Sequence, residues 1–315
     1  MYKKLLDKIK QYNKITLFRH QRPDGDAIFT MLALYEFIRT NFPDKKVKCC
    51  GYDLYSKKNK NDKVSDSFIK SSLAIIIDTS RSDRIDDDRF ALAEYIIKID
   101  HHPVVDSYGN LNIVKTDVGA CAELLSEILM SKAFSKYKIS NKVYEYLYSG
   151  IVTDTLNLKT ASTTPKTLKI ASILAEKGNL IISNIVDSLM DNSIDEFQKI
   201  SKLRNHLKID KNFGYIILHN KDLKEIGFDP YEAKNNISEF GTISDLNVWA
   251  FAVEIDGKYD ISCRSKRGYI INKISQRYGG GGHPNATGIK NLNKKELNNL
   301  FHELIELSTK KPVKQ

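Results

Sequence analysis

The sequence lacks any long apolar run. Its 315 residues are 41% hydrophobic, but no stretch approaches the roughly 20 consecutive apolar residues that a membrane-spanning helix needs. The first residues, MYKKLLDKIKQYNK, are basic and amphipathic, and neither the apolar segment nor the cleavage site of a signal peptide follows them. We therefore expect a first helix at this end, no association with a membrane, and a cytoplasmic protein.

Cysteine is scarce as well. The four cysteines are Cys49, Cys50, Cys121 and Cys263. None belongs to a CxxC pair and two of them are adjacent, which suits neither a zinc knuckle nor an ordinary disulfide framework. Free thiols in a reducing compartment are the expected state.

Acidic side chains are fewer than basic ones. The 39 Asp and Glu residues face 49 Lys and Arg residues, which gives a formal net charge of +10. Such an excess favours polyanionic partners. A chain this rich in Lys, Asn and Ile also acquires positive charge from its composition alone, so the charge becomes informative only beside a site that handles phosphate.

Residues 1–185 are expected to form one domain, because strand and helix patterns alternate there. Short apolar runs that end in polar residues predict buried parallel strands in KITLFRH, KVKCCGY, SLAIIIDTS and YIIKIDHH. Helices are expected in AIFTMLALYEFIRT, DDRFALAEY, GACAELLSEILMS, NKVYEYLYSGIVTD and TPKTLKIASILAEKG. This alternation predicts an α/β fold with a doubly wound, mostly parallel sheet.

The rest of the chain has a different style. Residues 186–208 are polar and helical in pattern, and we expect a linker helix there. Residues 209–315 are expected to form a smaller mixed α/β domain. Its elements are a strand at FGYIILH, a hairpin that turns at Asp256-Gly257, a helix at YIINKISQRY, the run GGGGHPNATG, and a final amphipathic helix at KKELNNLFHELIELS.

Carboxylates and imidazoles follow the predicted strands of the first domain. In an open parallel sheet, functional groups gather at the carboxyl ends of the strands. The groups at these ends, with Asp154 after the apolar SGIVT counted as a fourth end, are His20, Asp24, Asp26, Asp78, Asp100, His101, His102 and Asp154. A single aspartate after a strand is most often a helix cap or a turn former. Five carboxylates at one edge would repel one another unless they are protonated or neutralised by cations.

Divalent metal ions would supply that neutralisation. Asp and His ligands suit manganese, magnesium, cobalt or zinc. No cysteine lies at these strand ends, which favours Mn²⁺ and leaves Mg²⁺ and Co²⁺ open. The ligands suffice for two ions that share a bridging carboxylate, an arrangement that clamps a phosphoryl group and activates water.

The glycine run is the second candidate site. It follows a predicted helix, so it is neither a Rossmann nor a Walker loop, which both precede one. One interpretation is a flexible turn with a helix-capping glycine. Four consecutive glycines are entropically costly, and we favour a loop whose backbone approaches a ligand and whose N–H groups cradle an anion.

Together these segments resemble a known family. HQRPDGDA, IIIDTS, IDHHP and GIVTDT are similar to the four successive motifs of the DHH phosphoesterase superfamily. Arg264-Ser265 and GGGGHPNATG are similar to the DHH-associated C-terminal domain. The order and spacing match over nearly the whole chain. In layout the chain most resembles the stand-alone oligoribonucleases that also dephosphorylate 3′-phosphoadenosine 5′-phosphate (pAp).

The resemblance assigns roles to residues. His20 and Asp24 would hold one metal ion, and Asp78 would bridge to a second. The second ion would be held by Asp26, Asp78, His101 and Asp154. His102 would contact the phosphate or protonate the leaving oxygen, and Asp100 would orient a histidine. The substrate's phosphate and terminal nucleotide would be held by Arg264, Ser265, Gly279, Gly280, Gly281, Gly282 and His283.

The implied activity is manganese-dependent hydrolysis of short single-stranded RNA to mononucleotides, and of pAp, by a monomer or homodimer. Alternatives are a phosphodiesterase for linear or cyclic dinucleotides, a single-strand exonuclease of the same superfamily, or a nucleotide-binding protein without catalysis. The chain departs from the usual pattern after the fourth motif, at Leu156, Leu158, Lys159 and Ser162, where Gly, an aromatic, Arg and Asn are common. Tyr269 and Tyr278 are candidate base-stacking residues, but packing is the more ordinary role.

Overall fold

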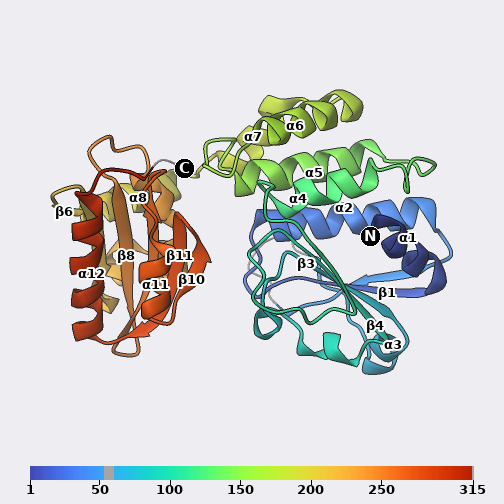
Figure 1. Cartoon of the computed structure of the whole chain (residues 1–315), viewed down its shortest axis with the longest axis horizontal. Coiled ribbons are helices and arrows are strands. Elements are labelled where there is room, and N and C mark those ends of the chain that lie inside the picture. Colours follow the sequence, from blue (N-terminus) through green and yellow to red (C-terminus); the bar gives the residue numbers. More distant parts are fainter. Residues whose placement is uncertain (53–59, 314–315) are drawn as a thin grey trace. The chain divides into compact units, whose positions relative to one another are not determined.

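The computed structural model describes residues 1–52 and 60–313. The chain divides into two compact units, Met1–Asp191 and Asn192–Gln315. Each unit has its own sheet and its own buried apolar clusters (Figure 1). The first sheet, with helices on both faces, confirms the α/β fold expected from the sequence.

The first unit is built on five parallel strands. They are β1 (Lys14–Phe18), β2 (Lys46–Cys49), β3 (Leu73–Ile77), β4 (Tyr95–Asp100) and β5 (Leu111–Val114). Their order is β2-β1-β3-β4-β5, and all neighbours pair in parallel. The strand order therefore reverses direction between β1 and β3. Such a reversal is a topological switch point, where ligands bind in open α/β sheets.

Both faces of this sheet are buried, which explains the continuous apolar runs of its strands. Leu17, Ile75 and Ile99 point into the larger cluster, on the face covered by α1 (Tyr2–Gln11), α2 (Gly25–Asn41), α4 (Cys121–Leu129) and α5 (Asn141–Asp154). Phe18 and Ile76 lie in the smaller cluster on the opposite face, with residues of α3 (Asp66–Lys70). Two further helices, α6 (Pro165–Gly178) and α7 (Ile182–Met190), pack on α5.

The second unit has a six-stranded mixed sheet in the order β10-β11-β9-β8-β7-β6. Its strands are β6 (Lys208–Asp210), β7 (Phe213–Leu218), β8 (Val248–Ile255), β9 (Lys258–Ser265), β10 (Gly281–His283) and β11 (Ala286–Leu292). Only β7 and β8 pair in parallel. The hairpin expected at Asp256-Gly257 is confirmed, since both residues have positive φ, as a type I′ turn requires.

Helices cover both faces of this second sheet. Residues of α11 (Asn272–Arg277) and α12 (Lys294–Ser308) pack on one face. Residues of α8 (Ile194–Arg204), α9 (Asn220–Ile226) and α10 (Pro230–Asn235) pack on the other. The expected linker, residues 186–208, therefore contains the end of α7 and all of α8 instead of one helix, and Ile200 and Leu203 are buried in the second unit.

Three local expectations were wrong. DDRFALAEY forms a short 3₁₀ helix, Asp88–Leu92, and Tyr95 already belongs to β4. The fifth strand, β5, was missed because LNIV is short and only half buried. Half of the glycine run is strand β10 at the sheet edge, paired with β11, so the run is not only a loop.

Among the described residues, no helix is both long and apolar enough to cross a membrane.

Candidate active site

The central strands β1, β3 and β4 deliver the first group of functional side chains. His20 follows β1, Asp78 directly follows β3, and Asp100 is the last residue of β4, with His101 and His102 next in the chain. Because the strands are parallel, their carboxyl ends meet at one edge of the sheet. These side chains consequently converge from segments that are far apart in sequence.

Two of the predicted site residues lie on helices, and the expected placement was wrong for one of them. Asp26 was expected on a loop but lies in the first turn of α2, which begins at Gly25, whereas Asp24 is the N-cap and accepts a hydrogen bond from the Ala27 N–H (3.0 Å). Asp154, which was counted with the strand ends, is the last residue of α5, and this confirms the helix predicted in NKVYEYLYSGIVTD. Helix ends that point at the sheet edge therefore complete the group.

Asp26 is held by another helix. Its carboxylate accepts hydrogen bonds from the N–H groups of Cys121 (2.6 Å) and Ala122 (2.9 Å), the first residues of α4. The positive end of the α4 dipole thus faces this carboxylate. Gly150 of α5 permits the close approach, because a Cβ there would lie 2.6 Å from Ala122 Cβ and 3.0 Å from Asp26 Oδ1.

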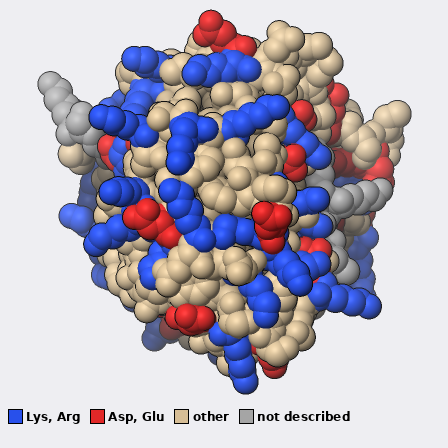
Figure 2. All heavy atoms as spheres, turned by 90° about the vertical axis from the view of Figure 1, so that its right-hand side faces the viewer, with Lys and Arg blue, Asp and Glu red and all other residues tan. Residues whose placement is uncertain are grey.

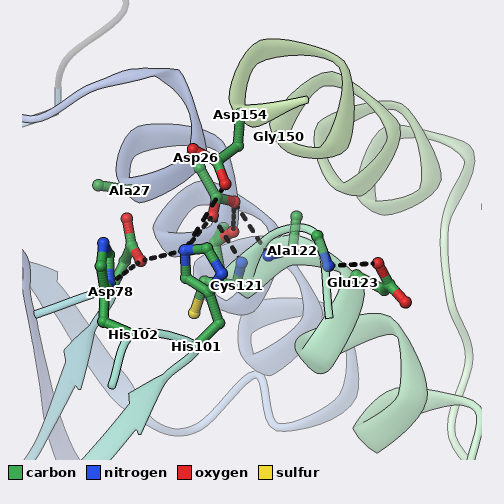
Figure 3. A network of polar contacts seen from close by, with 12 residues as sticks. Asp26, Ala27, Asp78, His101, His102, Cys121, Ala122, Glu123, Gly150 and Asp154 are labelled. Carbon is green, nitrogen blue, oxygen red and sulfur yellow. Dashed lines mark hydrogen bonds and ion pairs between the residues drawn. The ribbon is translucent and has the colours of Figure 1, made fainter. Parts of the chain in front are cut away.

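Figure 3 shows Asp26, Asp78 and Asp154 around the ring of His101. His101 Nε2 lies 3.4 Å from Asp78 Oδ1, 3.6 Å from Asp154 Oδ2 and 3.9 Å from Asp26 Oδ2. On the other side of Asp78, its Oδ2 lies 3.8 Å from His20 Nε2. The distance from His20 Nε2 to Asp24 Oδ2 is 3.7 Å. Asp78 therefore stands between two groups of side chains.

These groups have the composition of metal sites. Three clusters each offer ligand atoms within 4.8 Å of one another: His20, Asp24 and Asp78; Asp26, His101 and Asp154; and Asp78, His101 and His102. The structure thus brings together all six residues that the resemblance names as ligands, and it places Asp78 in two clusters. Coordination by these residues stays a prediction.

The environment of Asp78 fits a bound cation. The residue is 2% exposed, and its Oδ1 atom has no hydrogen-bond partner among the described residues. Burial, followed by the charges of Asp26 and Asp24, raises the pKa of Asp78 well above its ordinary value. Its φ of 54° is in the left-handed region, which is strained for a residue with a side chain. An ionised, buried carboxylate without a donor is unfavourable, and a divalent ion would relieve this.

The histidines are oriented for ligation. His20 Nδ1 lies 2.9 Å from the Gln21 carbonyl oxygen, so Nε2 faces Asp24 and Asp78. Such a backbone contact on the second ring nitrogen is typical of metal-binding histidines. Burial alone would lower the pKa of His20, but the adjacent Asp24 outweighs it and raises the pKa. Likewise, Asp154 and Asp26 outweigh burial and raise the pKa of His101.

His102 is held by two buried residues, Asp100 and Lys98, that follow one another in a line of contacts. Its Nδ1 lies 2.9 Å from Asp100 Oδ1, and Lys98 Nζ lies 3.2 Å from Asp100 Oδ2. Lys98 also donates to the backbone oxygens of Ser80 and Asp106. Burial would raise the pKa of Asp100, but the hydrogen bond from His102 and its charge lower it. Sequence reasoning missed Lys98, although a lysine within the apolar run YIIKID was a signal.

The turn after Asp154 has an unusual backbone. Leu156, Asn157 and Leu158 have φ values of 47°, 57° and 65°, all in the left-handed region. Glycine adopts this region without strain, so the glycine that the resemblance leads us to expect in place of Leu156 would suit this backbone. Of the other departures, Ser162 Oγ lies 2.8 Å from Thr160 Oγ1, and nothing in the described part of the chain explains Lys159.

In the second unit, Arg264 and His283 come from different strands. Arg264 on β9 and His283 on β10 both pair with Ala286 of β11. Residues directly opposite one another in antiparallel strands point to the same face. The two side chains therefore share a face of the sheet, with only the small side chain of Ala286 between them.

The side chain of Ser265 forms hydrogen bonds within the second unit. It is 8% exposed, its hydroxyl donates to the Tyr269 carbonyl, and it accepts from the Asn285 side-chain amide. Tyr269 is buried, and the Tyr278 hydroxyl donates to Glu303. These contacts favour packing over base stacking for both tyrosines. Substrate contact by Ser265 stays a prediction.

The glycines of the run differ in what the fold requires of them. Gly282 has a φ of 132°, and a Cβ there would lie 2.3 Å from the Ala286 carbonyl oxygen, so the backbone demands glycine. Gly280 is closely packed, and Gly279 has positive φ. At Gly281 neither reason applies, because its φ is not positive and an added Cβ would meet no atom within 4 Å. The missing side chain at Gly281 leaves open space on the edge strand.

Comparison with known proteins gives the same division of the chain. Residues 14–151 match the model of the DHH family, N-terminal domain, and residues 213–310 match the DHHA1 domain. The first match includes the segment from His20 to His102 and ends shortly before Asp154.

Curated relatives are similar over nearly the full length. The chain is 36% identical to the "Probable bifunctional oligoribonuclease and PAP phosphatase NrnA" of Streptococcus mutans, over 97% of this chain and 98% of that protein. It is 32% identical to the "Bifunctional oligoribonuclease and PAP phosphatase NrnA" of Bacillus subtilis, over 91% and 92% of the two chains.

A solved structure has the same fold. The exopolyphosphatase-related protein from Bacteroides fragilis superposes with a TM-score of 0.82 at 22% identity, over 97% of this chain and 95% of that chain. Motifs, geometry and full-length similarity therefore agree: the chain belongs to the DHH family, and it combines that family's N-terminal domain with a DHHA1 domain.

Proposed function

We propose that this protein hydrolyses short single-stranded oligoribonucleotides to mononucleotides and also dephosphorylates pAp. The observation that carries the proposal is the convergence of six Asp and His side chains around the buried Asp78, whose Oδ1 lacks a hydrogen-bond partner among the described residues. The names of the curated relatives, at 36% and 32% identity, support this choice of substrates.

The proposed cofactor is a pair of divalent ions, with Mn²⁺ preferred and Mg²⁺ or Co²⁺ as alternatives. His20, Asp24 and Asp78 would hold one ion. Asp26, Asp78, His101 and Asp154 would hold the other. Two such ions, when bound, neutralise the phosphoryl group and lower the pKa of water enough to give a nucleophile at neutral pH. No sulfur ligand contributes to these clusters, which agrees with a metal that prefers oxygen and nitrogen.

Residues of the chain would orient His102 and supply a proton to the leaving oxygen. Asp100 fixes the ring of His102 through Nδ1, and the buried Lys98 holds Asp100 in place. We assign the Nε2 atom of His102 to the phosphate of the substrate or to the leaving oxygen, which needs a proton when the bond breaks. Asp100 and Lys98 would act through His102, as positioning residues.

The second unit would bind the end of the substrate away from the bond that breaks. Arg264 and His283 share one face of the sheet, and an arginine binds phosphate with two parallel hydrogen bonds. The open space at Gly281 would let a phosphate or sugar approach the edge strand, where backbone N–H groups contribute. Ser265 would support this surface by holding Asn285 and the turn to Tyr269.

The decisive experiment is product analysis on RNAs of two to twenty-four nucleotides and on pAp, with Mn²⁺ supplied. We expect mononucleotides from RNA, AMP and phosphate from pAp, and the highest kcat/KM on two- to five-mers. A two-mer and an unstructured twenty-mer cleaved with equal efficiency would favour a general exonuclease.

The same assay separates the remaining rivals. Linear and cyclic dinucleotides of adenosine and guanosine should be included, since a strong preference for one of them would indicate a dinucleotide phosphodiesterase. We expect pAp to inhibit RNA cleavage competitively, because both substrates would use one set of metal ligands. No hydrolysis of any of these substrates with Mn²⁺, Mg²⁺ or Co²⁺ would refute the proposal and favour a nucleotide-binding protein without catalysis.

A further inference from the structure

The opposite edge of the first sheet carries an unusual group of lysines. The amino ends of β1 and β2 lie there, and Lys14 and Lys46 are paired neighbours in the sheet. With the ends of α1 and α3, the α2–β2 turn and the α4–α5 connection, this edge presents nine lysines. We call them the amino-edge lysines: Lys8, Lys10, Lys14, Lys45, Lys46, Lys70, Lys132, Lys136 and Lys138.

Hydrogen bonds join these segments into one surface. Lys45 Nζ donates to the backbone oxygens of Lys10 and Tyr12, which ties the α2–β2 turn to the end of α1. The Asn41 side chain bonds both the N–H and the carbonyl of Lys138, which ties the α4–α5 connection to the end of α2. Lys14 Nζ donates to Ser71 Oγ beside α3. The segments that carry the amino-edge lysines therefore adjoin one another at this edge of the sheet.

This face is not neutralised. In the described parts of the chain, no amino-edge lysine forms an ion pair with a carboxylate, whereas lysines elsewhere, such as Lys115, Lys199 and Lys234, do. Acidic side chains are few here: Asp7 lies in α1, Asp44 in the α2–β2 turn, and Glu94 just before the amino end of β4. Figure 2, seen from the side of the molecule where α1 lies in Figure 1, shows more Lys and Arg side chains than acidic ones, with the acidic ones spread among them.

Like charges held this close repel one another, and the repulsion is relieved when a polyanion binds and releases its counterions. Two of these lysines lie over aromatic rings: Lys8 Nζ lies 4.1 Å from the ring centre of Tyr95, and Lys136 Nζ lies 5.4 Å from that of Tyr137. Lysine ammonium groups fit the phosphodiester backbone of a nucleic acid, and binding through them would not depend on the base sequence.

We propose that the amino-edge lysines form a second binding surface for single-stranded RNA, separate from the catalytic edge. The strands are four to six residues long, so the two edges lie roughly 15 Å apart or more. The choice of RNA among polyanions rests on the proposed function. A strand held on this face would stay near the enzyme without occupying the Asp and His cluster at the carboxyl edge of the sheet.

The test uses the full chain with four exposed amino-edge lysines replaced: Lys10→Gln, Lys46→Gln, Lys132→Gln and Lys138→Gln. A matched control carries the same charge change at exposed lysines elsewhere: Lys169→Gln, Lys177→Gln, Lys221→Gln and Lys224→Gln. Binding of a fluorescent 24-mer RNA is followed by anisotropy over a range of salt concentrations. A chelator suppresses hydrolysis, so the binding result does not depend on whether the proposed catalytic activity is correct.

We expect the amino-edge variant to bind the 24-mer about tenfold more weakly at low salt, with a salt dependence reduced by up to about three counterions. The control should lose no more than about twofold. A third variant with Lys→Arg at the four amino-edge positions should bind like the wild type, because the charge is kept. Hydrolysis of a dinucleotide with Mn²⁺ should be equal in all of them.

Equal losses in the amino-edge variant and the control would overturn the proposal, since net charge alone would then explain binding. So would binding of anionic lipid vesicles, but not the 24-mer, through this face. Should the amino-edge variant fold poorly, acetylation of wild-type lysines with and without the 24-mer provides the second measurement. The RNA should protect Lys10, Lys46 and Lys138 but not Lys169; equal labelling would contradict the proposal.

Discussion

Arg264 and His283 lie opposite the same residue, Ala286, on the two strands that flank β11. Their side chains therefore point to one face of the second sheet and are separated by two strand spacings, about 10 Å. That spacing suits two contacts on one nucleotide, a phosphate at one end and a sugar or second phosphate at the other.

Arg264→Ala and His283→Ala should each lower kcat/KM on dinucleotides, mainly through KM, by about ten- to a hundredfold. The reason is that each change removes a charged or polar contact to bound substrate, which is worth about 1.5–3 kcal/mol. Metal content should stay at the wild-type level, because the proposed metal ligands belong to the other unit. Arg267→Ala, an exposed arginine nearby, serves as the control. Loss of metal in the Arg264 variant would contradict this division of roles.

Gly281→Ala should separate binding from stability. No atom lies within 4 Å of the added Cβ and the φ angle needs no glycine, so the melting temperature should change little. If substrate approaches this edge strand, the methyl group should raise KM. Gly282→Ala is the contrasting variant, because its Cβ would lie 2.3 Å from the Ala286 carbonyl oxygen. That variant should lose stability, and unchanged kinetics in a well-folded Gly281→Ala protein would argue against substrate contact.

Much of the Asp and His cluster at the carboxyl ends of the first sheet could be predicted, because the ends of its strands can be recognised in the sequence. Apolar runs such as LAIII end at Asp78, and YIIKI ends at Asp100, and parallel strands must bring such ends together. The helical placement of Asp26 could not be predicted in the same way, whereas NKVYEYLYSGIVTD predicted the helix that ends at Asp154. Asp26 bonds the backbone of Cys121 and Ala122, and no local pattern reveals a contact across so many residues.

The second site was predicted less completely, for a different physical reason. The four glycines indicated an unusual backbone. The position of His283 opposite Ala286, however, depends on the register between β10 and β11. Register is set by the hydrophobic pattern and the turn, and a three-residue strand of glycine and histidine has almost no such pattern. The hydrogen bond from Asn285 to Ser265 could not be predicted from the sequence for the same reason.

Removal of divalent metal should destabilise the first unit as well as abolish hydrolysis. Without cations the crowded carboxylates repel and Asp78 keeps a buried oxygen without a donor. A ligand present at a hundred times its dissociation constant stabilises the folded state by about 2.7 kcal/mol. Calorimetry with and without chelator, followed by addition of Mn²⁺, measures this. Full activity and an unchanged melting temperature after exhaustive chelation would refute the metal proposal.

Asp78→Asn should be the most damaging single change for catalysis. Asp78 belongs to two of the three clusters, so its loss should disturb both ions and lower kcat by several orders of magnitude. The metal-free variant should nevertheless melt at the wild-type temperature or slightly above it, because the amide removes a buried negative charge from among other carboxylates. Asp117→Asn, an exposed aspartate of the same unit, is the control. Near wild-type turnover in the Asp78 variant would make the bridging role wrong.

The turn after Asp154 offers a last test. Leu156 and Leu158 both have left-handed backbones, which costs a residue with a side chain about 1–2 kcal/mol. Leu156 is 42% exposed, whereas Leu158 packs against the apolar cluster of the first unit. Relief of strain should therefore dominate at Leu156, and loss of packing at Leu158.

Leu156→Gly should raise the free energy of unfolding by up to about 1 kcal/mol, since glycine also gains freedom in the unfolded chain and offsets part of the relief. Leu158→Gly should lower it by about 1–2 kcal/mol through lost apolar burial. Urea unfolding of both variants, with the metal state held fixed, gives the comparison. If Leu156 also contacts the nucleotide, its replacement should change KM on dinucleotides while metal content stays constant, because Asp154 keeps its place at the end of α5. A Leu156→Gly protein that is less stable than the Leu158→Gly protein would show that Leu156 packs in a way that outweighs its backbone strain.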